Sequence, residues 1–302
     1  MSSSRLRLPV AASPARLRGM SKPNDETLIA MHFGALHKWH LDMREAFAHV
    51  DELDALQFLA SAFGHLVSIE SVMISLEHKD RPPQLLYQRG IPEKYRESII
   101  DRYFSGGYLL DPFCLAVEQG LAEGFYHLEE IAPDNFFESE YYKTYYLKAG
   151  SSEDSFYIVD TVNESQISIS LFQGFGGEEL RSEQLNLLRA VEPLVRELIS
   201  KFGQRGLQQC VATNVETETE RHDDFKQRVQ SAFENFGRDL LTEREREVAH
   251  MVLRGHSVKS TASQFGISPE TVRMHRKSLY LKLNVNSQSE LFALFFEWLR
   301  KN

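Results

Sequence analysis

The sequence predicts two domains of different class: an α+β domain in which helices flank an antiparallel sheet, followed by an all-α domain of four helices. The chain has 302 residues, 42% of them hydrophobic, which is enough for two separate cores. Helical and strand-like patterns alternate as far as residue 202, whereas only helical patterns with their own capping residues follow residue 238. These observations set the fold class and the order of the domains.

The first domain is expected to occupy residues 28–202, and its elements follow from apolar spacing and from turn residues. The expected elements are helices within 28–63, strands 67–76 and 84–89, short helices from Pro92 and Asp111, an aromatic-rich helix 135–148, strands 155–162 and 166–172, and an amphipathic helix 178–202. This size and this order of elements resemble the GAF and PAS families of small sensory domains. The resemblance implies a sensory role for the first domain.

The segments on either side of this domain differ from it in composition. Residues 1–20 contain four arginines and no acidic residue, and their apolar stretches are too short for a secretion signal. We interpret residues 1–27 as a disordered tail or an over-extended start. Residues 203–220 are polar, and phenylalanines recur at helical spacing between 225 and 236, so residues 203–237 are predicted to be a linker with an amphipathic helix.

Charge is distributed unevenly along the chain. The net charge is −9, but from Arg238 onward there are 11 Lys and Arg residues against 7 Asp and Glu. Only this last part therefore suits the polyanionic surface of nucleic acid. No apolar run approaches the roughly 20 residues that cross a bilayer. No membrane partner is therefore expected. Cys114 and Cys210 lie far apart and form no CxxC motif, so a reducing cytoplasm is the expected location.

The last domain, residues 238–302, carries an unusually complete set of helix starts and stops. Serine or threonine stands before each expected helix, where its side chain can accept a hydrogen bond from a free backbone N–H. Glycine or asparagine stands after three of them, where the backbone turns left-handed. The starts are Thr242 with Glu245, Ser257, Ser268 before Pro269, and Ser287 with Glu290, and the stops are Gly255, Gly266 and Asn284. Gly266 makes the tight turn that a helix-turn-helix (HTH) requires between its two helices.

This pattern resembles the LuxR-type, also called FixJ/NarL-type, four-helix DNA-binding domain. The matching residues are Leu241, Thr242, Arg244, Glu245, Glu247, Val248, Gly255, Ser257, Lys259, Ala262, Ile267, Ser268, Thr271, Val272, His275, Lys282, Leu283 and Val285. Val258, Thr261 and Asn284 depart from the family pattern, at positions outside the expected DNA face. The resemblance implies a LuxR-family HTH regulator that binds double-stranded DNA, with the third helix of the domain in the major groove.

Three side chains of that third helix, Arg273, Met274 and Lys277, are predicted to contact base edges. Arg and Lys donate to guanine O6 or N7, and Met contacts a thymine methyl group. Contacts to phosphates are expected from a second group: Lys259, Ser268, Thr271 and Arg276. These contacts would position the domain on the duplex without reading its sequence.

Aromatic residues crowd the second half of the first domain, as they do in pockets for small organic ligands. The candidate pocket residues are Tyr108, Phe113, Tyr126, Tyr141, Tyr145 and Phe156. Aromatic residues also fill ordinary cores, so a pocket and a core stay alternatives. An acyl-homoserine-lactone receptor of this family would need a cluster of Trp, Tyr and Asp here, but Trp39 and Trp298 lie elsewhere in the sequence.

Together these observations predict a DNA-binding transcriptional regulator, acting as a homodimer, whose first domain senses a small ligand and controls promoter binding. A regulator gated by a protein partner and a quorum-sensing lactone receptor remain alternatives. RNA polymerase is expected as a further partner. The sequence contains no GxxxxGK[ST] phosphate loop, GxSxG elbow or HExxH motif, so no enzyme activity, cofactor or metal site is expected.

Overall fold

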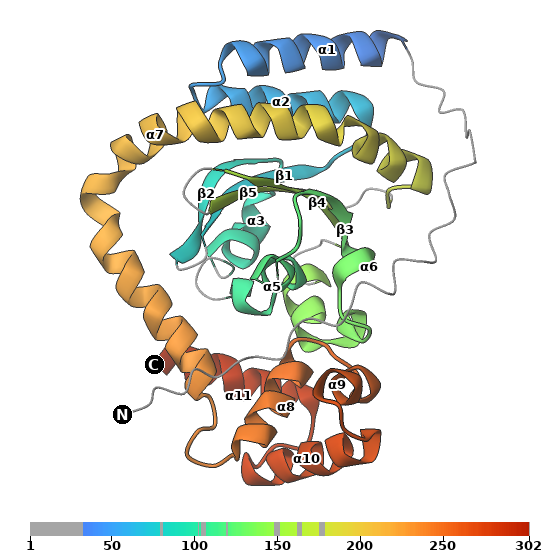
Figure 1. The fold of residues 1–302 in the computed structure, drawn as a ribbon, viewed down its shortest axis with the longest axis vertical. Coiled ribbons are helices and arrows are strands. Elements are labelled where there is room, and N and C mark those ends of the chain that lie inside the picture. Colours follow the sequence, from blue (N-terminus) through green and yellow to red (C-terminus); the bar gives the residue numbers. More distant parts are fainter. Residues whose placement is uncertain are drawn as a thin grey trace.

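The computed structural model describes residues 33–301, except for residues 79–80, 102, 104–106, 119, 148–151, 162–164 and 175–178. The tail expected at residues 1–27 lies outside the described residues. Figure 1 shows an α+β part, in which helices lie on both faces of a sheet, and an all-helical part that contains the C-terminus. The fold class expected from the sequence is confirmed.

The described strands form one antiparallel sheet with the order β2-β1-β5-β4-β3. The strands are β1 (Ser71–His78), β2 (Arg81–Arg89), β3 (Gly124–His127), β4 (Glu153–Asp160) and β5 (Ser165–Gln173). Side chains alternate between the faces, so Tyr157 and Val159 enter one core while Phe156 and Ile158 enter the other. The sequence does not predict β3, because its four residues carry little pattern and only the pairing with β4 defines it.

One face of the sheet is covered by α2 (Asp54–Leu66) and by the first part of α7 (Ser182–Asn235), and α1 (Phe33–Ala48) lies outside them (Figure 1). The ring of Phe63 stacks on Tyr157 with a centroid distance of 5.3 Å. The hydroxyl of Tyr157 donates a hydrogen bond to the Leu188 carbonyl at 2.8 Å. Burial of each such side chain contributes about 1.5–3 kcal/mol, so this packing fixes α7 on the sheet.

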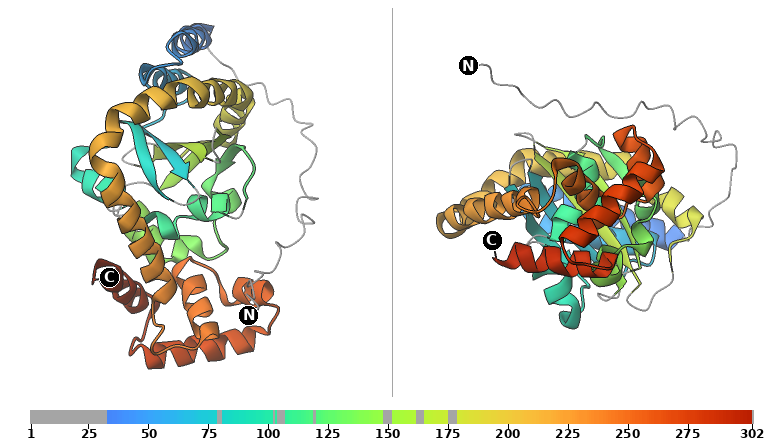
Figure 2. Two further views of the ribbon diagram at one scale, coloured as in Figure 1. Left: turned by 60° about the vertical axis from the view of Figure 1, so that its left-hand side comes forward. Right: turned by 90° about the horizontal axis from the view of Figure 1, so that it is seen from below.

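Helix α7 continues beyond the α+β part. The predicted linker, residues 203–237, is helical as far as Asn235, which corrects the expected polar connection after residue 202. Elongation costs little once a packed segment has nucleated the helix, and Glu, Gln and Arg propagate it well. At its far end Phe233 and Phe236 pack on Phe295, with ring distances of 5.3 and 5.2 Å. Figure 2 shows α7 running from the sheet to the all-helical part.

The other face of the sheet carries short elements. They are α3 (Glu93–Arg96), the π-turn η2 (Glu97–Asp101), the 3₁₀ turn η3 (Gly107–Leu110), α5 (Pro112–Glu118), α6 (Leu128–Ile131), the 3₁₀ turn η4 (Phe136–Glu138) and the π-turn η5 (Tyr142–Leu147). The helix predicted over residues 135–148 is therefore broken. Ser139 adopts extended backbone at the break, and its hydroxyl accepts a hydrogen bond from the Tyr142 N–H at 3.1 Å, so it ends η4 and caps the next turn.

The all-helical part consists of α8 (Glu243–Leu253), α9 (Val258–Phe265), α10 (Pro269–Lys282) and α11 (Gln288–Lys301). Thr242 and Glu245 form the predicted capping box, and Ser257 and Ser268 cap α9 and α10. Gly266 and Asn284 have φ angles of 65° and 54°, as their left-handed positions require. Within the part of the chain that the structure describes, no helix combines the length and apolar character needed to cross a membrane.

Candidate functional site

A buried carboxylate joins the first and third helices of the C-terminal part. Glu245 of α8 accepts hydrogen bonds from Ser278 at 2.6 Å and from Lys282 at 2.7 Å, both on α10. Desolvation acts to raise the pKa of Glu245, but the bonds from Lys282, Ser278 and Thr242 outweigh it and lower the pKa to about 2. With Val272 and Leu279 buried beneath it, α10 is held in one orientation.

The predicted base-contacting side chains share the exposed side of α10. Arg273, Met274 and Lys277 are all exposed, and Met274 has 62% of its surface accessible. The guanidinium of Arg273 forms an ion pair with Glu270 at 2.8 Å, one turn earlier on the same helix. Figure 1 shows α10 on the side of the molecule that faces away from the sheet. The exposed surface of α10 is thus available to a groove of DNA.

The residues predicted to contact phosphates are more varied in their surroundings. Lys259 is exposed in the first turn of α9. The Ser268 hydroxyl is used as a cap, because it accepts from the Thr271 N–H at 3.1 Å. Arg276 is held against the Tyr280 hydroxyl by hydrogen bonds of 3.2 and 3.3 Å. Ser268, Thr271 and Arg276 lie at the start and along α10, whereas Lys259 lies on α9. The contacts of all four to DNA stay predictions.

Aromatic side chains gather on the sheet face opposite α2 and α7, and we call this group the aromatic lobe. Its buried members are Tyr108, Phe113, Phe136, Tyr141, Tyr142, Tyr146 and Phe156. Four of the six predicted pocket residues belong to it. Tyr126 lies at its edge, with its hydroxyl donating to the Ala122 carbonyl at 2.9 Å. The side chain of Tyr145 lies outside the described residues.

The sequence analysis missed the acidic residue of this lobe, Asp111. Its side chain is only 5% exposed, and it accepts hydrogen bonds from the Phe113 N–H at 2.8 Å and from the Tyr103 hydroxyl. Desolvation raises the pKa of Asp111 to about 7, although these hydrogen bonds oppose the shift. Sequence did offer a signal, because Asp111 directly follows the apolar run 107–110, yet Asp-Pro suggested only a helix start.

Further polar groups lie close to Asp111. The Tyr103 hydroxyl and the Cys114 sulfur are 3.2 Å apart. Burial raises the pKa of Tyr146 well above its usual value, and the negative charges of Asp111 and Asp154 act in the same direction. Glu77 of β1 also raises the pKa of Asp111. The aromatic lobe therefore contains a buried, acidic group of side chains rather than a purely apolar core.

The tryptophans lie outside this lobe. Trp39 is buried in the helical layer around α1, and Trp298 packs at the end of α11 against Phe236. The aromatic lobe is thus formed mainly by tyrosine and phenylalanine, and the tryptophan expected of a lactone receptor is not among its described members.

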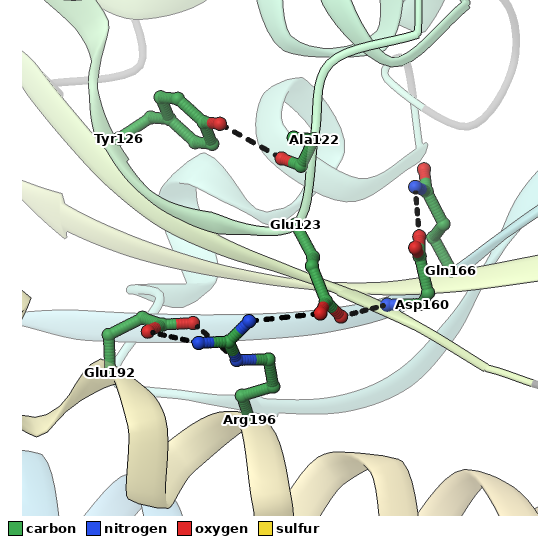
Figure 3. Close-up of polar contacts among 7 residues, drawn as sticks. All are labelled: Ala122, Glu123, Tyr126, Asp160, Gln166, Glu192 and Arg196. Carbon is green, nitrogen blue, oxygen red and sulfur yellow. Dashed lines mark hydrogen bonds and ion pairs between the residues drawn. The ribbon is translucent and has the colours of Figure 1, made fainter.

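Two arginines of α7 fasten this helix to β3 and its surroundings. Arg196 forms ion pairs with Glu123 at 2.9 Å and with Glu192 at 3.0 Å (Figure 3). Arg189 donates to the Phe125 carbonyl at 3.2 Å and pairs with Glu130 at 2.7 Å. Since α7 also leads to the C-terminal part, these contacts connect the aromatic side of the sheet with the helix that carries α8 to α11.

Comparison with known proteins identifies the family. The model described as bacterial regulatory proteins, luxR family, matches residues 239–295. The chain is 31% identical over 189 residues to an HTH-type transcriptional regulator in the exeN 3′ region of Aeromonas salmonicida, a match that covers 63% of this chain and 94% of that protein. It is also 44% identical over 59 residues to the transcriptional regulatory protein UhpA of Escherichia coli, which is 20% of this chain and 30% of UhpA.

Two solved structures are similar to parts of the chain. The LBD domain of VqsR from Pseudomonas aeruginosa matches 54% of this chain and 95% of its own, with 25% identity and a TM-score of 0.47. SdiA from Escherichia coli matches 86% of this chain and 96% of its own, with 14% identity and a TM-score of 0.39. The Aeromonas relative extends well beyond the segment that the family model covers. The chain therefore belongs to the luxR family of bacterial regulatory proteins and is an HTH transcriptional regulator.

Proposed function

We propose that the first domain of this regulator binds a small organic ligand at Asp111 in the aromatic lobe, and that binding controls how the HTH domain engages DNA. The single observation that carries the proposal is the carboxylic acid of Asp111, which is buried among tyrosine rings. Buried acids with strongly shifted pKa values concentrate at functional sites, because folding alone rarely favours them.

A purely structural role accounts for only part of this arrangement. Asp111 caps α5 through the Phe113 N–H, and capping stabilises a helix by about 1 kcal/mol. That benefit does not require burial, since capping carboxylates function well in contact with water. Here the carboxyl group is desolvated enough to raise its pKa to about 7, which costs more than the cap contributes. A ligand that donates a hydrogen bond to Asp111 would offset this cost.

The surroundings also indicate which kind of ligand fits. The carboxylate of Glu77 acts on Asp111, and the carboxylates of Asp111 and Asp154 act on Tyr146, so the charges around the site are negative. The other side chains of this cluster are apolar, and many of them are aromatic. A ligand with an apolar body and a polar end that donates hydrogen bonds would match both features. Hydrogen-bond donors are therefore favoured over acceptors at the polar end of the ligand.

The HTH domain is proposed to act as one half of a homodimer. One recognition helix reads only a few base pairs, so two copies on half-sites about one helical turn apart would supply the specificity that a promoter requires. We propose Arg273, Met274 and Lys277 as base-contacting residues and Lys259, Ser268, Thr271 and Arg276 as phosphate contacts. The regulator would act in the cytoplasm and contact RNA polymerase at the promoter.

A thermal-shift screen of the full chain against small metabolites tests the ligand. A compound present at about 100 times its Kd should stabilise the chain by about 2.7 kcal/mol and raise the melting temperature in a concentration-dependent way. The same compound should act weakly on the Asp111→Asn variant. A screen without any stabilising compound on the folded wild type would refute the ligand and favour a regulator gated by a protein partner.

A further inference from the structure

A loop of the α+β part touches the HTH domain at the turn between α8 and α9. The Asp134 carboxylate accepts hydrogen bonds from the Ser257 N–H at 3.0 Å and from the Ser257 hydroxyl at 2.6 Å. The next residue, Asn135, donates its N–H to the Gly255 carbonyl at 3.1 Å. These contacts join residues more than a hundred positions apart, so they belong to the packing of one domain on the other.

An apolar contact lies beside these hydrogen bonds. Phe136 is fully buried, and a Cβ atom built at Gly255 would stand 2.9 Å from the Phe136 Cα and 3.3 Å from the Ser139 Cβ. Gly255 also has a φ of 83°. Glycine is thus needed here twice, once to end α8 and once because the two backbones approach too closely for any side chain. The contact is packed closely on both sides.

The polar part of the contact consists of the Asp134 carboxylate at the start of α9. Ser257 caps α9, so its N–H and hydroxyl lie at the positive end of that helix. Partial desolvation acts to raise the pKa of Asp134, but the two hydrogen bonds from Ser257 outweigh it and lower the pKa. Asp134 is therefore ionised at neutral pH. A carboxylate held by an N–H, a hydroxyl and the helix dipole imitates the way a phosphate is bound.

In an HTH domain, the helix before the recognition helix crosses the DNA backbone, and helix starts are frequent phosphate contacts. Lys259 stands exposed in the same turn of α9 as Ser257. The figures show that α10 itself stays clear of the α+β part (Figures 1 and 2). The loop thus occupies donors that suit the DNA backbone and leaves the base-reading surface open.

We propose that the loop Asp134–Phe136 is an intramolecular brake on DNA binding, in which the Asp134 carboxylate occupies donors at the start of α9 that a DNA phosphate would take. Duplex binding then requires the loop to leave the HTH domain. The brake lowers the affinity for every duplex alike, because phosphate contacts carry no sequence information.

The same loop reaches into the aromatic lobe. The ring of Phe136 lies 5.8 Å from that of Tyr146 and 6.2 Å from that of Tyr141. A ligand at Asp111 that displaces these tyrosines would move the loop with them. This link rests on the ligand site proposed above, whereas the brake itself does not.

The test measures binding of the full chain, without any added compound, to a fluorescent duplex of arbitrary sequence about 30 base pairs long, roughly three helical turns. Fluorescence anisotropy is followed between about 50 and 200 mM salt. Asp134→Ala should bind about five- to tenfold more tightly than the wild type. The slope of log affinity against log salt should stay close to that of the wild type, because both proteins make the same phosphate contacts once the loop has left.

Glu129→Ala is the matched control, because it removes the same charge from an exposed position close to the loop. It should bind within about twofold of the wild type, since a solvent-exposed charge away from the start of α9 is largely screened at such salt. Asp134→Asn repeats the test with the shape of the side chain kept, and it should also bind more tightly than Glu129→Ala. Affinities of both Asp134 variants that equal or fall below that of Glu129→Ala would overturn the brake. The ligand site fails separately, in the thermal-shift screen.

Discussion

Replacing Asp111 by asparagine should change how the stability of this protein depends on pH. The pKa of Asp111 is about 7 in the folded chain, against 3.8 for an unperturbed group. The folded state therefore holds a proton that the unfolded chain has released, and the free energy of unfolding falls as pH rises from about 4 to about 7. At 1.36 kcal/mol for each pKa unit, this loss amounts to at most about 4 kcal/mol above pH 7.

Asparagine does not titrate, and it still accepts the hydrogen bond from the Phe113 N–H, because Asn is as good a helix cap as Asp. The Asp111→Asn variant should therefore lack this loss. Between about pH 5 and pH 8 its stability relative to the wild type should rise by about 3 kcal/mol, the part of the shift that falls inside that range.

Urea unfolding of both proteins, followed by far-UV circular dichroism at several pH values in that range, measures the difference directly. The other titrating groups are common to the two proteins, so they cancel in the comparison unless they contact Asp111. A stability difference that does not change between pH 5 and pH 8 would show that Asp111 ionises normally. The proposal that Asp111 is a buried neutral acid that binds a ligand would then be wrong.

Three further predictions concern the HTH domain. Glu245→Gln should lower the melting temperature at pH 7. The pKa of about 2 for Glu245 corresponds to about 3 kcal/mol of stability, which is present above pH 4.5 and lost as pH falls toward 2. An unchanged melting curve would contradict this. Arg273→Ala should relax base preference at one position by about 1–3 kcal/mol, whereas Lys259→Ala should weaken all duplexes alike, and equal behaviour in anisotropy titrations would refute the assignment. Gly255→Ala should destabilise the chain by more than the about 1–2 kcal/mol that its left-handed backbone costs, because the added Cβ would clash with Phe136. A smaller loss of thermal stability would count against the close contact.

The HTH domain could be predicted almost completely because its determinants are local. Thr242 and Glu245 lie three residues apart and form their capping box without help from the rest of the chain. Ser268 with Pro269 starts α10, and Gly266 turns the chain before it. Such signals survive in a single sequence because each one depends on neighbouring residues only.

The α+β part was predicted less well because its details depend on tertiary contacts. Strand β3 is defined by its pairing with β4, and a segment of four residues is too short for its sequence to predict that pairing. The aromatic-rich segment 135–148 has helical spacing, yet the buried Ser139 breaks it. The polar segment after residue 202 has the composition of a linker, but a packed helix before it and Phe233 and Phe236 after it keep it helical.

The candidate sites follow the same division. Exposure of Arg273, Met274 and Lys277 could be anticipated, because helical periodicity alone separates them from the buried Val272 and Leu279. Neither Asp111 nor Asp134 could be recognised in this way. The role of Asp111 depends on burial among tyrosines that come from several segments, and that of Asp134 depends on Ser257 in the other domain.

The most direct measurement is hydroxyl-radical footprinting of the full chain on a duplex selected from a random pool. An HTH regulator that binds as a dimer through α10 should protect two half-sites about 10 base pairs apart. Replacing Arg273 and Lys277 together by alanine should abolish both protected regions at once. One isolated half-site protected by a single chain, or protection that survives the double replacement, would contradict paired reading of DNA through this helix.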